Sequence, residues 1–124
     1  MIELLRGFPD NVVAIKCHGE VTRNDYDTVL VPAAEMALKS HDKIRLLYEA
    51  GPEFEGVDAG AVWEDFKLGM EHLTRWERIA VVTDVDWIRH TFRVFSFVIP
   101  GMAKIFRPDE QAKAREWISE DMTH

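Results

Sequence analysis

Residues 77–101, ERIAVVTDVDWIRHTFRVFSFVIPG, contain a strand, a turn and a helix in succession. Ile79 to Thr83 is the most continuous apolar run of strand type, which is typical of a strand covered on both faces of a sheet. Asp84 and Asp86 follow it, at the strand end where α/β proteins bind ligands. The next residues are apolar at helical spacing until Pro100 and Gly101, which end the helix. This stretch therefore predicts a central strand followed by an apolar helix.

Strand-type and helix-type segments alternate along the rest of the chain. Short runs rich in β-branched residues predict strands at residues 2–6, 12–17, 44–48, 79–83 and 102–106. Apolar residues at helical spacing predict helices at residues 26–39, 59–73, 87–99 and from 108 onward. The order ββαβαβαβα predicts an α/β fold with a mixed, largely parallel sheet and right-handed crossovers. We expect one domain over residues 1–124.

Local signals refine these elements. Thr22, with Asp25 three residues later, forms a short-armed capping box at the start of a helix. Pro32 lies inside that helix and removes one backbone donor, so we expect a kink or two abutting helices. The glycines and proline in residues 50–56 predict a loop. The predicted inward faces hold Tyr26, Val29, Leu30, Ala33, Met36 and Ala37 in the first helix and Ala114, Trp117 and Ile118 in the last.

The composition limits the classes of function. Hydrophobic residues make up 47% of the 124 residues and charged residues 30%, as in ordinary globular proteins. Fifteen basic and twenty-two acidic residues give a net charge of −7, which disfavours nucleic-acid binding. The single cysteine, Cys17, excludes a disulfide within this chain, and its strand pattern predicts a buried thiol. The longest uncharged run, residues 94–103, is too short to span a membrane, and we expect a cytoplasmic protein.

Several phrases, together with the length and the element order, resemble the SpoIIAA-like proteins, relatives of the STAS domain of sigma-factor antagonists. They are the strand IRLLYE (44–49), the Trp63-x-x-Phe66 helix, RWERIAVVTD (75–84) followed by Trp87, and FRPDEQAKAREWI (106–118). The resemblance covers nearly the whole chain. It implies a four- to five-stranded mixed sheet with helices mainly on one face, an architecture shared with CRAL-TRIO lipid-carrier domains. It is a stronger guide to fold than to function.

One departure from the family pattern concerns a phosphorylation switch. Sigma-factor antagonists resemble one another in carrying a phosphorylatable Ser or Thr at the amino end of the helix after the third strand. Here no hydroxyl residue stands between Tyr48 and Thr74. A kinase-driven switch is therefore not expected at this position. Asp58 can serve as a plain helix N-cap, which we prefer, or as a fixed negative charge that imitates phosphorylation.

Glu49, Asp58, Asp84 and Asp86 form a predicted acidic cluster at the carboxyl ends of the strands. Such carboxylates can bind a cation or act as solvated strand ends, and we favour the second interpretation. Asp84 and Asp86 also stand where haloacid-dehalogenase phosphatases carry their nucleophile and acid. Too few residues follow Asp86 for the later motifs of that class. We therefore interpret Asp86 as a helix cap and Asp84 as part of the turn.

The remaining chemical motifs are absent from the sequence. The five histidines show neither HxxxH nor HxH spacing, and there is no GxGxxG, P-loop lysine or GxSxG motif. We therefore expect no enzyme activity, no metal and no cofactor.

Apolar residues on two predicted helices form the candidate surface for a ligand or partner. Most apolar residues of the 87–99 helix share one arc of a helical wheel, but Phe97 falls on the polar face, between Arg93 and His90. Phe97 is either covered by a neighbouring helix or marks a partner, dimer or ligand contact. The candidate surface comprises Trp63, Phe66, Met70, Trp87, Phe92 and Phe97.

Two hypotheses of function lead, in order of preference. The first is a non-enzymatic regulatory or protein-interaction module of STAS type, which contacts a protein partner or forms a homodimer. The second is a binding protein for a small apolar or lipid-like ligand, held where the Trp63–Met70 face and the 87–99 helix part to form a pocket. A Mg²⁺-dependent hydrolase at Asp84 and Asp86 comes third.

Overall fold

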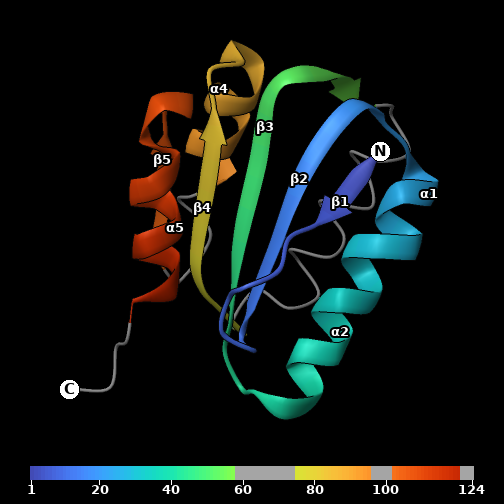
Figure 1. Ribbon diagram of the computed structural model, residues 1–124, viewed down its shortest axis with the longest axis vertical. Coiled ribbons are helices and arrows are strands. Elements are labelled where there is room, and N and C mark those ends of the chain that lie inside the picture. Colours follow the sequence, from blue (N-terminus) through green and yellow to red (C-terminus); the bar gives the residue numbers. More distant parts are fainter. Residues whose placement is uncertain (58–74, 96–101, 121–124) are drawn as a thin grey trace.

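The computed structural model describes residues 1–57, 75–95 and 102–120 (Figure 1). Within these residues, strands form one sheet in the order β1-β2-β3-β4-β5. They are β1 (Ile2–Leu4), β2 (Val12–Val21), β3 (Ile44–Val57), β4 (Trp76–Thr83) and β5 (Met102–Phe106). β1 runs antiparallel to β2, and each later pair of neighbours is parallel. The predicted α/β fold with a mixed, largely parallel sheet is confirmed.

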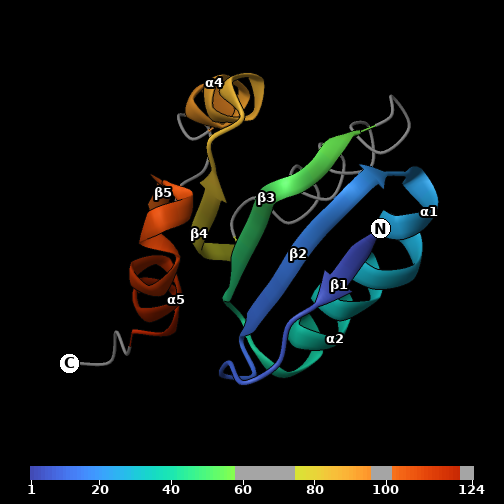
Figure 2. The same ribbon diagram turned by 45° about the horizontal axis from the view of Figure 1, so that its top comes forward.

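Helices cover both faces of this sheet. They are α1 (Arg23–Asp25), a π-helical segment (Tyr26–Leu30), α2 (Val31–Ser40), α4 (Asp86–Phe95), a 3-10 turn (Pro108–Glu110) and α5 (Gln111–Ser119). Residues of the π-helical segment, α2 and α4 share one apolar cluster, whereas α5 packs in a separate cluster on the opposite face. Figures 1 and 2 show α2 and α5 on opposite sides of the sheet. Of the helices in the described residues, α5 packs on one face and the π-helical segment, α2 and α4 pack on the other, in keeping with the prediction that helices lie mainly on one face.

The predicted helix at residues 59–73 lies outside the described residues. In the described part of the chain, none of the helices is both long enough and apolar enough to cross a membrane.

β4 occupies the interior of the sheet, between β3 and β5. All its residues from Arg78 to Thr83 are buried, so the prediction of a strand covered on both faces is confirmed. Cys17 on β2 is also fully buried, as its strand pattern predicts. The interior strands thus provide the apolar layer on which the helices of both faces pack.

β3 is longer than predicted, and the loop expected at residues 50–56 is wrong. The last pair between β3 and β4 joins Ala50 and Thr83, after which β3 continues beside β2. Register shifts on both sides of Gly19 accommodate this continuation. Gly19 has a φ of +59°, which glycine adopts at little steric cost. Pro52 falls in the irregular stretch, where its missing N–H removes no regular ladder bond.

The helical segment after β2 begins at the predicted cap. The Thr22 hydroxyl accepts a hydrogen bond from the Asp25 backbone N–H at 3.3 Å, and the Asp25 carboxylate accepts one from the Thr22 backbone N–H at 2.9 Å. Pro32 lies at the start of α2, directly after the π-helical segment. Because the change of helical type sits beside the proline, the predicted interruption of the helix is confirmed.

The π-helical segment changes which residues of α2 face the sheet. A π turn holds more residues than an α turn, so the helix after it is rotated relative to an unbroken α-helix. The buried residues of α2 are Ala34, Ala37 and Leu38. Met36 is 71% exposed, so the prediction that it faces inward is wrong.

The last two helices begin close to their predicted positions. Arg89 donates its backbone N–H to the carbonyl oxygen of Val85 at 3.1 Å, which makes Asp86 the first residue of α4. Val85 is therefore the cap, one residue before the predicted cap Asp86, and the charge of Asp86 is favourable near the amino end of the helix. In α5, the predicted inward residues are confirmed as buried: Ala114, Trp117 and Ile118.

Candidate functional site

The predicted ligand or partner surface falls largely outside the described residues. The backbone and side chains of Trp63, Phe66, Met70 and Phe97 lie outside the described residues. The same is true of Asp58, which belongs to the predicted acidic cluster. For Trp87 and Phe92 the backbone belongs to α4, but their side chains lie outside the described part. This surface therefore stays a prediction.

Of the predicted acidic cluster, Asp84 and Asp86 follow a strand end as predicted and Glu49 does not, while Asp58 lies outside the described residues. Glu49 lies inside β3, which continues to Val57, so its predicted position at the end of a strand is wrong. Asp84 and Asp86 are exposed where β4 meets α4. Across residues 1–57, 75–95 and 102–120, no group of three or more His, Cys, Asp or Glu side chains is placed to hold a metal ion.

Glu49 instead forms a buried polar cluster with α5. Its Oε1 accepts a hydrogen bond from Gln111 Nε2 at 2.5 Å, and its two oxygens accept hydrogen bonds from the Arg115 guanidinium at 3.0 and 3.2 Å. The hydrogen bonds to Glu49 raise the pKa of Arg115; burial opposes this shift, and the Glu49 charge adds to it. The Glu49 side chain is 2% exposed and that of Arg115 is 43% exposed. The pair therefore ties α5 to the middle strand of the sheet.

Two arginines from neighbouring strands hold the carboxyl end of α5. Arg45 on β3 donates hydrogen bonds to the carbonyl oxygens of Ile118, at 3.0 Å, and of Glu120. Arg78 on β4 donates one to the carbonyl oxygen of Trp117 at 2.7 Å, and its guanidinium lies 4.7 Å from the Trp117 ring centre. The last carbonyls of a helix have no partner within the helix and carry partial negative charge. Arg45 and Arg78 give these carbonyls hydrogen-bond donors and place positive charge beside them.

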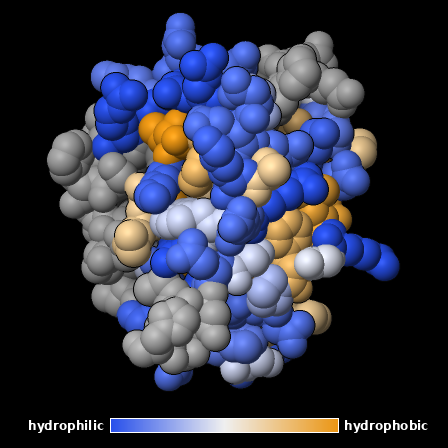
Figure 3. All heavy atoms as spheres, turned by 60° about the vertical axis from the view of Figure 1, so that its left-hand side comes forward, coloured by the Kyte–Doolittle hydropathy of each residue, from blue (hydrophilic) through white to orange (hydrophobic). Residues whose placement is uncertain are grey.

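The buried charges under α5 thus have structural partners. A general acid or base must reach a proton of its substrate, whereas both oxygens of Glu49 are bonded to α5 and are almost inaccessible to solvent. Figure 3 shows that the side of the molecule carrying α5 is mainly hydrophilic, with hydrophobic residues gathered in limited areas. We therefore interpret this cluster as an anchor for α5 rather than as a reactive site.

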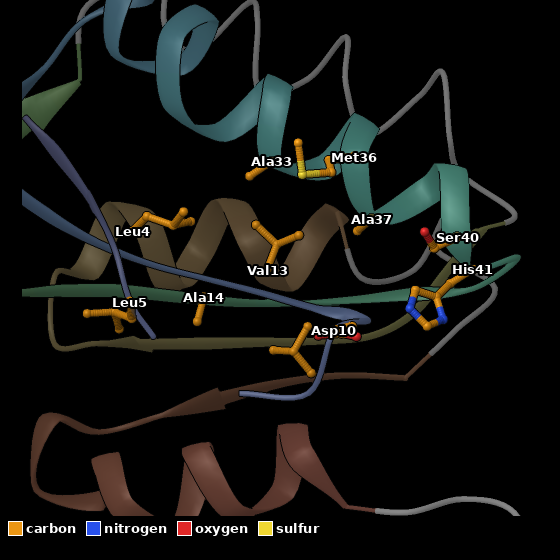
Figure 4. A pocket seen from close by; sticks show the side chains of 11 residues that line it. Leu4, Leu5, Asp10, Val13, Ala14, Ala33, Met36, Ala37, Ser40 and His41 are labelled. Carbon is orange, nitrogen blue, oxygen red and sulfur yellow. The ribbon is translucent and has the colours of Figure 1, made fainter. Parts of the chain in front are cut away.

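A groove of about 340 Å³ lies between α2 and the first two strands (Figure 4). In Figure 4, Leu4 and Leu5 lie at one end of the groove and Ser40 and His41 at the other. Eight lining residues are apolar and three are polar: Leu4, Leu5, Val12, Val13, Ala14, Ala33, Met36 and Ala37, with Asp10, Ser40 and His41. The groove is therefore mainly apolar, with Ser40 and His41 at one end.

Large apolar side chains are exposed along this groove. Leu4 on β1 is 49% exposed, and Met36 on α2 is exposed through the rotation that the π-helical segment causes. β1 is a short edge strand whose pairing with β2 ends at Leu4 and Ile15, so β1 does not cover the beginning of β2. Exposed apolar residues beside a concave surface are typical of an interaction site.

Sequence reasoning missed the groove. The available signal was the pair Leu4 and Leu5, since consecutive side chains of a strand face opposite sides of the sheet. In an edge strand, one of two such leucines is poorly covered. The exposure of Met36 had no comparable signal because it depends on the π-helical segment.

Comparisons with known proteins agree with this architecture. The family model described as SpoIIAA-like matches residues 12–119 of the chain. Among solved structures, the chain is similar to an uncharacterised protein from Shewanella loihica with a SpoIIAA-like fold. The two chains are 29% identical with a TM-score of 0.70, and the alignment covers 95% of this chain and 92% of that one. No curated protein matches. Since the family model spans most of its length and the fold agrees, the chain belongs to the SpoIIAA-like family.

Proposed function

We propose that the chain is a non-enzymatic regulatory module that acts by binding another protein, and that the groove beside α2 is its contact surface. The observation that carries this proposal is the exposure of Leu4 and Met36 on a mainly apolar groove. Covering apolar surface is favourable by about 25 cal/mol per Å², so a partner seated on these side chains gains binding free energy. The buried charges on the opposite face are bonded to α5 and present no comparable apolar surface.

The proposal does not include a phosphorylation switch after the third strand, because no Ser or Thr stands between Tyr48 and Thr74. The surface predicted from the sequence around Phe97 stays a separate candidate. Its test is Phe97→Ala, which should change self-association or partner capture if that surface is the contact. If Phe97→Ala changes neither self-association nor partner capture, the surface around Phe97 is not the contact.

Site-specific photo-crosslinking in the host cell tests the groove. A photo-reactive residue placed at Met36 should form a discrete protein adduct, and the adduct should disappear when Leu4→Glu is added. The matched control places the same residue at Lys113, which is exposed on α5 on the opposite face. Equal adducts at both positions, or no protein adduct at Met36, contradict the proposal.

A second candidate function is the binding of a small apolar ligand in the same groove. Its volume of about 340 Å³ lies within the range of ligand pockets, roughly 300–1,000 Å³, and its few polar groups suit a ligand with one polar end. Native mass spectrometry of freshly purified protein should then show a co-purified small molecule, which Ala33→Trp displaces by filling the groove. If the original protein and Ala33→Trp each show only the mass of the bare polypeptide, this function is contradicted.

A further inference from the structure

The outer edge of β1 carries backbone groups that point away from the sheet. In the described part of the chain, β1 is an end strand that pairs with β2 alone. The N–H of His18 donates to the carbonyl oxygen of Met1 at 2.8 Å, so Met1 and Glu3 direct their backbone groups toward β2. Because these groups alternate along an antiparallel strand, the N–H and C=O groups of Ile2 and Leu4 face outward. They can pair with another extended chain.

The helices α1 and α2 lie beside the outer edge of β1. Figures 1 and 2 both show α1 and α2 extending past β1 on the outer side of the sheet. Leu4 and Met36 line the groove between the edge strand and the helix. An extended chain paired with β1 would therefore direct every second side chain toward this apolar groove.

A second copy of this chain is a poor occupant of the edge. In a symmetric antiparallel pair of β1 strands, Glu3 at the centre of the three-residue strand would face its own counterpart. Like charges directly opposite each other destabilise a strand pair, and each copy carries a net charge of −7. The short length and central charge of β1 are also devices by which edge strands avoid pairing with themselves. A partner strand of opposite charge avoids this repulsion.

We propose that the β1 edge and the groove bind an extended segment of a partner protein in which apolar residues alternate with lysine or arginine. This rests on the proposed function and adds the conformation and charge of the partner. The apolar side chains enter the groove between Leu4 and Met36, and the backbone pairs with Ile2 and Leu4. Glu3 lies on the opposite face from Leu4, which is also the face to which the alternating cationic side chains of an added strand point.

The charges near the edge support a cationic partner. Glu3 is half exposed on β1, where its Oε1 lies 2.8 Å from His18 Nε2, and Asp10 is an exposed carboxylate at the groove. Lys16 stands opposite Glu3 on β2, and Arg6 and Lys39 are exposed, so the attraction comes mainly from the overall charge of −7 rather than from a continuous acidic patch. We therefore expect a modest electrostatic contribution that salt weakens, on top of the apolar and backbone contacts.

Peptide selection tests the proposal. Dodecapeptides recovered from a randomised display library on the folded chain are synthesised, and their affinity is measured by fluorescence anisotropy. Leu4→Glu and Met36→Glu should each weaken binding by about tenfold or more, which corresponds to ~1.4 kcal/mol. Met102→Glu is the matched control, because Met102 is an exposed methionine on β5 at the other edge of the sheet. It should leave the affinity unchanged, and circular dichroism confirms that each variant folds.

Backbone pairing is tested on the same peptides. N-methylation of the peptide residues that face β1 should abolish binding, whereas N-methylation of the alternate residues should not. In two-dimensional NMR, the Ile2 and Leu4 amide signals should shift on binding as hydrogen bonds form. Replacing the lysines and arginines of the peptide with glutamate should weaken binding, and Glu3→Gln should reduce that difference.

The outcomes separate this inference from the proposed function. If a protein crosslinks at Met36 but no Leu4-dependent peptide is recovered, or if binding tolerates N-methylation at every position, the strand-addition model is overturned while the interaction function stands. If crosslinking at Met36 also fails, both are overturned. Recovery of peptides without a preference for cationic residues overturns the assigned charge.

Discussion

The two faces of the sheet are built by different means. Under the π-helical segment, α2 and α4, a large apolar cluster surrounds one hydrogen bond between the hydroxyls of Tyr26 and Tyr48, at 3.1 Å. Under α5, a smaller apolar cluster is accompanied by three buried charged side chains: Arg45, Glu49 and Arg78. Apolar packing is non-directional, whereas hydrogen bonds to named atoms set a single position. The comparison teaches that α5 depends on polar contacts for its placement more than α2 does.

Both helices share one device at their carboxyl ends. Arg75, which precedes β4, donates hydrogen bonds to the carbonyl oxygens of Leu38, at 2.9 Å, and His41, at 2.8 Å, at the end of α2. Arg45 and Arg78 do the same for α5 from within the sheet. The difference lies in burial, because Arg45 and Arg78 are buried whereas Arg75 is partly exposed. Matched substitutions can therefore measure how far burial strengthens the same contact.

The largest expected effect is on the Glu49–Arg115 pair. Arg115→Ala leaves a buried carboxylate with Gln111 as its remaining partner among the residues that the structure describes, so we expect a loss of about 3 kcal/mol in the free energy of unfolding. Urea unfolding measures it. Lys113→Ala, an exposed change on the same helix, should stay within about 0.5 kcal/mol of the original protein.

The reverse substitution sharpens this result. Glu49→Gln should cost less, about 1 kcal/mol, because Arg115 is partly exposed and water can solvate it. Equal losses for Arg115→Ala and Glu49→Gln, or a loss below 0.5 kcal/mol for Arg115→Ala, would show that Glu49 is not held by this pair.

The next effect tests whether buried arginine fixes α5. Arg45→Met keeps an apolar stem but removes the hydrogen bonds to Ile118 and Glu120 and the pair with Glu77 at 2.6 Å, so we expect a loss of about 2 kcal/mol. Hydrogen exchange should accelerate in α5 and stay unchanged in α2. Uniform acceleration in both helices would mean that Arg45 supports the whole sheet rather than α5.

The third effect concerns Arg75, which holds the carboxyl end of α2 on the other face of the sheet. Arg75→Met removes the same type of contact from α2, but water can replace its partly exposed bonds, so we expect about 1 kcal/mol. Exchange should accelerate near residues 38–42 and remain unchanged in α5. If Arg75→Met lowers the free energy of unfolding as much as Arg45→Met does, burial does not strengthen these contacts.

These local features differ in how well the sequence predicts them. Thr22 with Asp25, Pro32, and the inward residues of α5 act through neighbours within a few positions, so pattern reasoning finds them. The β4 strand is equally clear, because a continuous apolar run has few alternatives. The mixed, largely parallel sheet then follows from the rules of α/β connections.

The errors arise where distant residues decide the outcome. The extension of β3 depends on pairing with β2, and the partner of Glu49, Arg115, stands 66 positions later. Met36 is exposed because of a change of helical type that no residue pattern announces. The groove needs both this exposure and a short β1. Its residues could be named only once the strands and helices were placed.

The smallest expected effect concerns the cap of α1. Burial raises the pKa of Asp25, but the hydrogen bonds from the Thr22 backbone N–H, the N-terminal ammonium and the Thr22 hydroxyl outweigh it, so the pKa lies below its ordinary value. A carboxyl whose pKa is lowered on folding stabilises the protein above its unfolded pKa and loses that contribution as the pH falls through its folded pKa.

Asp25→Asn should therefore lower the free energy of unfolding by about 0.5 kcal/mol at neutral pH and leave it unchanged at the acid end of the range. Urea unfolding of both proteins between pH 7 and about pH 2 measures the difference, which should shrink as acid is added. Thr22→Val should lose only part of its cost in acid, because the Thr22 hydroxyl both donates to the Asp25 carboxylate at 3.1 Å and accepts from the Asp25 backbone N–H at 3.3 Å, and the second bond does not depend on the charge of Asp25. A constant difference for Asp25→Asn across this range would show that the charge of Asp25 does not stabilise the α2 side of the sheet.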